Sequence, residues 1–96
     1  MAVVRITRFT ADPADVDQLL ARRAELITAV RSSFPGLTET RLARLDDGTW
    51  IDEWRWESTS ALEAALVGAP GGPEAAAAFA LTANPGAEQA EIVDER

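Results

Sequence analysis

The chain has 96 residues, a formal net charge of −7, and no cysteine, histidine, tyrosine or lysine. This length predicts a single domain over residues 1–96, with a core thin enough for oligomerisation to add stability. Without histidine or cysteine, the composition excludes a conventional zinc, copper or iron–sulfur site, an imidazole base and a thiolate nucleophile, and without lysine it excludes a Schiff base. The chain is acidic and has no basic stripe, no apolar run that would span a bilayer and no signal peptide. It therefore predicts a cytoplasmic protein that binds neither nucleic acid nor membrane.

The first two predicted elements are a strand and a long helix. Residues 3–9 (VVRITRF) are rich in β-branched and aromatic side chains, which predicts a strand. Asp12 and Pro13 are start signals for an amphipathic helix that residues 34–36 (FPG) end. Arg23 interrupts the apolar stripe of this helix, which is predicted to comprise Val16, Leu20, Ile27, Val30 and Phe34.

A hairpin and a second helix follow. Residues 37–45 alternate in polarity, and the turn signal DDG at 46–48 predicts that they pair antiparallel with residues 49–56. Ser58 is the predicted N-cap of a helix that runs to about Val67, with Leu62 and Leu66 as its apolar anchors.

The last third of the chain predicts a short helix and a closing strand. Residues 68–73 (GAPGGP) form a predicted flexible break, after which an alanine-rich helix runs to about Leu81. Residues 84–86 (NPG) predict a turn, and residues 87–95 predict a strand.

This order of elements predicts an α+β, ferredoxin-like fold: a four-stranded antiparallel sheet with helices on one face and the first and third strands in the centre. The other face would carry Val4, Ile6 and Ile51 among charged side chains. An exposed apolar face of this kind is typical of an interaction surface. The simplest partner is a second copy of the chain, which would bury the face in a homodimer joined through the sheets.

All three tryptophans lie in WIDEWRW, residues 50–56. Alternate residues of a strand point to opposite faces, so Trp50, Asp52, Trp54 and Trp56 share one face. That face is either ordinary core or the wall of a pocket, and the pattern alone leaves both open.

The segments TRFTADPADVDQLLARRAELI and PGLTETRLARLDDGTWIDEWRWESTSALEAAL resemble the antibiotic biosynthesis monooxygenase family, within the dimeric α+β barrel superfamily, over about residues 3–67. The resemblance implies a pocket between sheet and helices and oxidation of aromatic polyketides without a metal or flavin. The family's strand-3 tryptophan falls on Trp56. Its strand-1 asparagine falls on Thr7, and the histidine found in several members falls near Ala65.

With Trp56 facing the helices, the strand pattern places Arg5, Thr7 and Phe9 on the pocket face as well. Trp56 then packs against a ligand or serves as core, and the same choice holds for Trp50 and Trp54. The remaining candidates for the ligand-binding lining are Leu66 and Phe79, the latter expected at the pocket floor.

Three charged side chains are candidates for the site. Asp52 is either a general base with a pKa raised by burial, or a non-catalytic residue that forms a salt bridge with Arg5 or Arg23 or lies in water at the strand end, and the non-catalytic role is favoured. Arg23 either clamps an anionic ligand or extends past the sheet edge into water.

The resemblance implies a cofactor-free monooxygenase acting on a polycyclic phenol or similar small aromatic molecule, with Trp56, Thr7 and Asp52 as its catalytic candidates. Two alternatives stay open: a non-catalytic protein that binds aromatic ligands, and a polyketide-type cyclase or isomerase with Asp52 as its base. No metal and no cofactor is expected.

Overall fold

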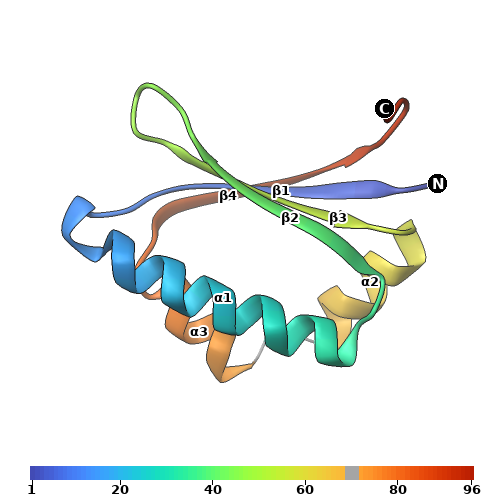
Figure 1. Cartoon of the computed structure of the whole chain (residues 1–96), viewed down its shortest axis with the longest axis horizontal. Helices are drawn as coiled ribbons and strands as arrows, with labels where there is room; N and C mark the ends of the chain where they lie inside the picture. Colours follow the sequence, from blue (N-terminus) through green and yellow to red (C-terminus); the bar gives the residue numbers. More distant parts are fainter. Residues whose placement is uncertain (69–71) are drawn as a thin grey trace.

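The computed structural model describes residues 1–68 and 72–96, and shows one sheet covered on a single face by helices (Figure 1). The elements are β1 (Val3–Thr10), a 3₁₀ turn η1 (Pro13–Asp15), α1 (Val16–Ser33), β2 (Leu37–Arg44), β3 (Trp50–Trp56), α2 (Thr59–Gly68), α3 (Pro73–Phe79) and β4 (Ala83–Glu91). Within the predicted break at 68–73, residues 69–71 lie outside the described residues. No helix among the described residues is both long and apolar enough to cross a membrane.

The strand order is β2-β3-β1-β4, and every neighbouring pair is antiparallel. This confirms the predicted α+β, ferredoxin-like sheet with the first and third strands at its centre. The sheet stays open within one chain, with β2 and β4 as its edges.

The start of α1 differs from the prediction. Asp12 caps the preceding turn η1, where its Oδ1 accepts a hydrogen bond of 2.9 Å from the backbone N–H of Ala14. The predicted stripe was wrong at Leu20, which is 45% exposed, whereas Leu19 is 2% exposed. Leu19 belongs to the face that points at the sheet, and Leu20 lies about 100° further round the helix.

The hairpin between β2 and β3 forms as predicted. Gly48 has φ 91°, a conformation in which a side chain would be strained. The backbone N–H of Thr49 donates a hydrogen bond of 2.9 Å to Asp47 Oδ1, and this bond lowers the pKa of that carboxyl.

The predicted NPG turn is wrong, because these three residues lie inside β4. Asn84 adopts a left-handed conformation with φ 55°, and the pairing with β1 shifts register between Arg8 and Thr10. The Asn84 side chain donates a hydrogen bond of 3.1 Å to Thr10 Oγ1. Pro85 is tolerated here because β4 is an edge strand, which can omit one N–H.

The buried core occupies one end of the space between sheet and helices. It is formed by Val3, Val30, Leu37, Trp56, Leu62 and Ala65, of which Leu62 is the most buried at 1% exposed. Ser58 caps α2 as predicted, since its Oγ accepts a hydrogen bond of 3.1 Å from the backbone N–H of Ala61.

The opposite face of the sheet has no helix on it (Figure 1). Val4, Ile6 and Ile51 are only half-buried there. At one end, Arg55 forms a bidentate ion pair with Glu95, at 2.5 and 2.6 Å, which draws the chain's last residues toward β3. The hydrogen bonds from Arg55 lower the pKa of Glu95.

Candidate functional site

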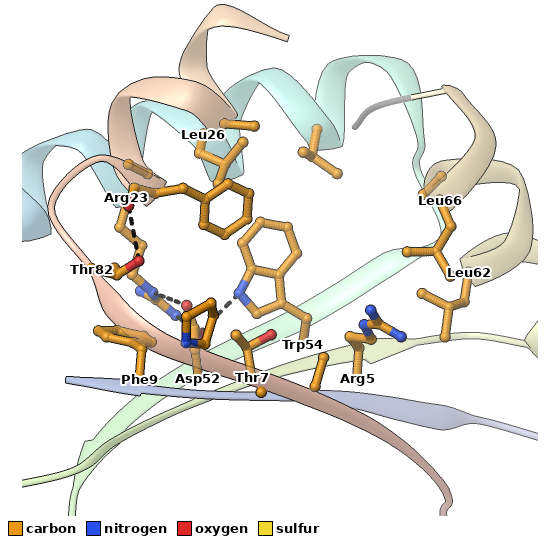
Figure 2. A pocket seen from close by; sticks show the side chains of 18 of the residues that line it. Arg5, Thr7, Phe9, Arg23, Leu26, Asp52, Trp54, Leu62, Leu66 and Thr82 are labelled. Atoms are coloured by element: carbon orange, nitrogen blue, oxygen red, sulfur yellow. Dashed lines mark hydrogen bonds and ion pairs between the residues drawn. The ribbon is translucent and has the colours of Figure 1, made fainter. Parts of the chain in front are cut away.

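A cavity of about 420 Å³ lies between the sheet and the helices (Figure 2). Its sheet wall consists of Arg5, Thr7, Phe9, Asp52, Trp54 and Trp56, together with residues 85–87 of β4. Its helical wall consists of Leu19, Arg23, Leu26 and Val30 from α1, Leu62, Ala65 and Leu66 from α2, and Ala75, Ala78 and Phe79 from α3. The wall is therefore mainly apolar, with a few polar groups at defined places.

The largest polar feature is a cluster formed by Arg23, Asp52 and Trp54. Arg23 Nε donates to Asp52 Oδ2 at 3.0 Å, and Arg23 Nη2 donates to Asp52 Oδ1 at 2.9 Å. Trp54 Nε1 donates to the same Oδ1 at 2.9 Å. The side chains of the ion pair are only 16% and 14% exposed, so the bidentate geometry offsets a substantial cost of desolvation. Of the possibilities considered for Asp52, the structure shows the salt bridge, and its partner is Arg23.

Trp56 lies at the end of β3 and is 3% exposed. Its Nε1 is buried and has no hydrogen-bond partner among the described residues. A buried donor without an acceptor is costly, roughly 1–3 kcal/mol. Trp56 is part of the core cluster and also part of the cavity wall.

Thr7 lies opposite Asp52 on the neighbouring strand, and Figure 2 shows the two side chains next to each other. Its hydroxyl makes no hydrogen bond with any described residue, so it is free to meet a ligand. Ala65, near which the resemblance places the histidine of several family members, is 5% exposed and also lines the cavity.

Trp50 does not line the cavity, contrary to the expectation from its position on the tryptophan face. It stacks on Phe9 with ring centroids 6.4 Å apart, and the guanidinium of Arg44 lies 5.1 Å from the centre of its ring. Trp50 thus caps the outer side of Phe9, which itself does line the cavity.

Leu66 and Phe79 line the cavity but are 43% and 56% exposed. Phe79 lines the cavity as expected, but at this exposure it does not seal the cavity from solvent. These two apolar side chains extend from α2 and α3.

Several lining residues were not predicted. Leu19, Leu26 and Val30 lie four residues before Arg23 and three and seven residues after it, so the position of Arg23 itself was the signal that would have located this face of α1. Pro85 and Gly86 were missed because they were assigned to a turn, and Ala87 was assigned to the closing strand but not to the cavity. Among the described residues, no group of three or more aspartate or glutamate side chains is placed to hold a metal ion.

An antiparallel sheet with an apolar cavity under its helices defines a class of small α+β proteins. The chain belongs to the antibiotic biosynthesis monooxygenase family, whose model matches residues 2–69. None of the curated proteins compared with the chain matches it.

Solved structures share the fold over nearly the whole chain. A mutant of SnoaB, a cofactor-independent oxygenase from Streptomyces nogalater, aligns with a TM-score of 0.77 and 22% identity, covering 98% of this chain and 95% of that one. The haem degrader MhuD from Mycobacterium tuberculosis, with two haems bound in its active site, aligns with a TM-score of 0.70 and 25% identity, covering 98% of each chain. Rv0793 from the same organism aligns at 0.68 and 25%, covering 99% of this chain and 98% of that one.

Proposed function

We propose that the chain is a monooxygenase that oxidises a polycyclic aromatic molecule, of the polyketide type, without a metal or flavin. The observation that carries this proposal is the apolar cavity of about 420 Å³ with Trp56 in its wall, at the position of the family's tryptophan. Its volume is in the usual range for small-molecule sites, about 300–1,000 Å³.

The proposed chemistry needs an electron-rich ring system that loses a proton readily. In an anthrone, the methylene group between the two outer rings is such a centre. Loss of a proton gives an enolate that reduces O₂, a carbon–oxygen bond forms at the former methylene carbon, and the oxygen–oxygen bond then breaks as water leaves. One oxygen atom ends in the new carbonyl and the other in water. The cavity would orient the rings and keep bulk water from the intermediates.

Two residues have direct roles in this proposal. Trp56 packs against the rings, and the Thr7 hydroxyl hydrogen-bonds a ring oxygen in place of the family's asparagine. A threonine hydroxyl donates one hydrogen bond and accepts others, so it can fill part of the role of an amide.

Asp52 is better suited to positioning than to accepting a proton. Both of its oxygens already accept hydrogen bonds from Arg23 or Trp54. Taking up a proton would weaken bonds that are worth about 1.5–3 kcal/mol each when one partner is charged. This geometry gives less support to a cyclase or isomerase, which would use Asp52 as its base.

A non-catalytic aromatic-binding protein is the second candidate. It is favoured by Thr7, which stands where the family has asparagine, and by the lack of histidine in the chain, a residue that several members carry near the position of Ala65. A haem degrader like MhuD is less well supported, because the chain has no histidine, cysteine or tyrosine to bind the iron.

Oxygen uptake with anthrone as substrate tests the proposal. Thr7→Val is expected to slow uptake about tenfold, the effect of losing roughly 1.4 kcal/mol from one hydrogen bond in the transition state. Thr28→Val, an exposed threonine on α1, is the matched control and should leave uptake unchanged.

Mass spectrometry of the product separates the three functions. Anthraquinone formed with matching oxygen consumption supports the monooxygenase. Ligand binding without turnover would replace it with the binding protein, and an isomerised product without oxygen consumption would replace it with the isomerase.

A further inference from the structure

The charges of the side chains that line the cavity do not sum to zero. They are Arg5, Arg23 and Asp52. Arg23 and Asp52 neutralise each other in their bidentate ion pair. The cavity therefore keeps one positive charge, that of Arg5, inside a chain whose formal net charge is −7.

Arg5 makes no ion pair and no hydrogen bond with any described residue. It lies on β1 between Trp54 on one side and Gln89 on the other, so its neighbours in the sheet carry no opposite charge. Figure 2 shows its side chain rising from β1 into the space between sheet and helices, beside Leu62. Arg5 is half-buried as a residue and lines the mainly apolar wall of the cavity.

Two acidic residues on the same face are equally near Arg5 in register: Asp52, which pairs with Thr7 and is bound to Arg23, and Glu91, which pairs with Val3 on β1. Glu91 is exposed and lines a separate polar groove with Met1 and Ser58. It forms no ion pair with Arg5, so the cation of the cavity remains available.

From this arrangement we infer that Arg5 is a specificity-determining residue that selects an aromatic ligand carrying an anionic oxygen group, a carboxylate or a phenolate. A cation beside an apolar wall is costly to desolvate unless an opposite charge meets it, and a guanidinium matches a carboxylate or phenolate through charge-assisted hydrogen bonds. Because the whole chain is acidic, its long-range field repels anions, and selection has to come from a local cation such as Arg5.

The inference rests on the cavity being the ligand site, as in the proposed function, and it distinguishes Arg5 from Arg23. Arg23 is already bound to Asp52 through two nitrogens, and diverting it to a ligand would leave that carboxylate with only Trp54 as a donor. Arg5 can meet a ligand without breaking a hydrogen bond or an ion pair with any described residue.

Calorimetric titration with two probes of the same shape tests this selection. The probes are 9-anthracenecarboxylate and the neutral 9-anthracenecarboxamide. The unaltered protein is expected to bind the carboxylate about tenfold or more tightly than the amide. Arg5→Met should abolish this preference while leaving amide affinity nearly unchanged, and Arg5→Lys should restore part of it.

Two control variants keep the test specific. Arg41→Met removes an exposed cation of β2 and should leave the preference intact. Glu91→Gln should change the preference little, because Glu91 does not pair with Arg5. A second titration uses 2-naphthol at pH values below and above the pKa of its hydroxyl. If the ionised form binds more tightly and this difference depends on Arg5, phenolate is a source of the anionic oxygen.

Equal affinity for both anthracene probes in the unaltered protein would overturn the inference, as would a preference that survives in Arg5→Met or disappears only in Arg23→Met. Binding of neither probe would overturn it together with the cavity as an aromatic site. Failure of the oxygenase proposal would give a different result: oxygen uptake would be missing, while the preference for the carboxylate probe would persist and still depend on Arg5.

Discussion

At the scale of single residues, the arrangement of charges around Asp52 decides what the site can do. The strand pattern placed Asp52, Arg5 and Thr7 on one face, and the stripe of the first helix placed Arg23 above them. Both arginines were therefore within reach of the carboxylate. The choice between them depends on how α1 docks across the sheet, which no local pattern encodes. The structure pairs Arg23 with Asp52 and leaves Arg5 to the cavity.

Replacing one member of this pair is expected to destabilise the fold. Asp52→Asn leaves the Arg23 guanidinium without a charged partner at 16% exposure, which should lower the free energy of unfolding by roughly 2–3 kcal/mol. Urea denaturation measures this difference. The double variant Arg23→Met with Asp52→Leu should lose less than Asp52→Asn alone, because it leaves no unpaired charge.

The exposed pair Arg22–Glu25 on α1 is the matched control for this experiment. Arg22→Met should change the unfolding free energy by no more than about 0.5 kcal/mol. A loss in Asp52→Asn as small as that in Arg22→Met would mean that the cluster is solvated and does not hold α1 to the sheet.

At the scale of elements, the sequence patterns predicted each strand and helix in the right order. The errors arose where tertiary contacts overrode a local signal. Residues 84–86 carry strong turn signals, yet they join the sheet because Thr10 and Asn84 bond across β1 and β4. The predicted helical stripe included Leu20 and omitted Leu19, because both are leucines and only the docking of α1 shows which one is buried.

The junction between α1 and β2 depends on a close approach of the backbone to α2. A Cβ added at Gly36 would lie 2.6 Å from the Ala61 Cβ, much closer than two carbon atoms can approach. Gly36→Ala is therefore expected to cost about 1–3 kcal/mol of stability, measured by thermal or urea unfolding.

Two further variants test whether the clash with α2 causes the loss of stability. Adding Ala61→Gly removes the clash, so the double variant should be less destabilised than the sum of the two single changes. Gly86→Ala meets no atom within 4 Å and should be close to neutral. Equal effects of Gly36→Ala and Gly86→Ala would show that α2 moves aside without cost.

At the scale of the whole molecule, the sheet is covered on one face only. The open face carries the half-buried Val4, Ile6 and Ile51, and the ion pair of Arg55 with Glu95 lies at one end of it. The side chains that point to this face follow from alternation along the strands. Whether a second copy covers them depends on the shape of the whole surface, which the strand pattern does not describe.

We expect a homodimer joined through this face. Sedimentation at micromolar concentration should show a dimer for the unaltered protein and a monomer for Ile6→Asp, which places a charge in the apolar patch. Leu20→Asp, an exposed position on α1, is the control and should stay dimeric. A stable monomer of the unaltered protein at these concentrations would contradict the proposal.

The three tryptophans of β3 can also report ligand binding by their own indole N–H resonances. Trp50 lies beside the Arg44 guanidinium outside the cavity, the Trp54 N–H is bound to a carboxylate, and the Trp56 N–H is buried without a partner among the described residues. Three such different surroundings should give three separate indole resonances in a ¹H–¹⁵N spectrum. A molecule entering the cavity would shift the resonances of Trp54 and Trp56 and leave that of Trp50 in place. The position of a ligand along β3 can thus be followed with the chain's own tryptophans, after uniform ¹⁵N enrichment and without any attached probe.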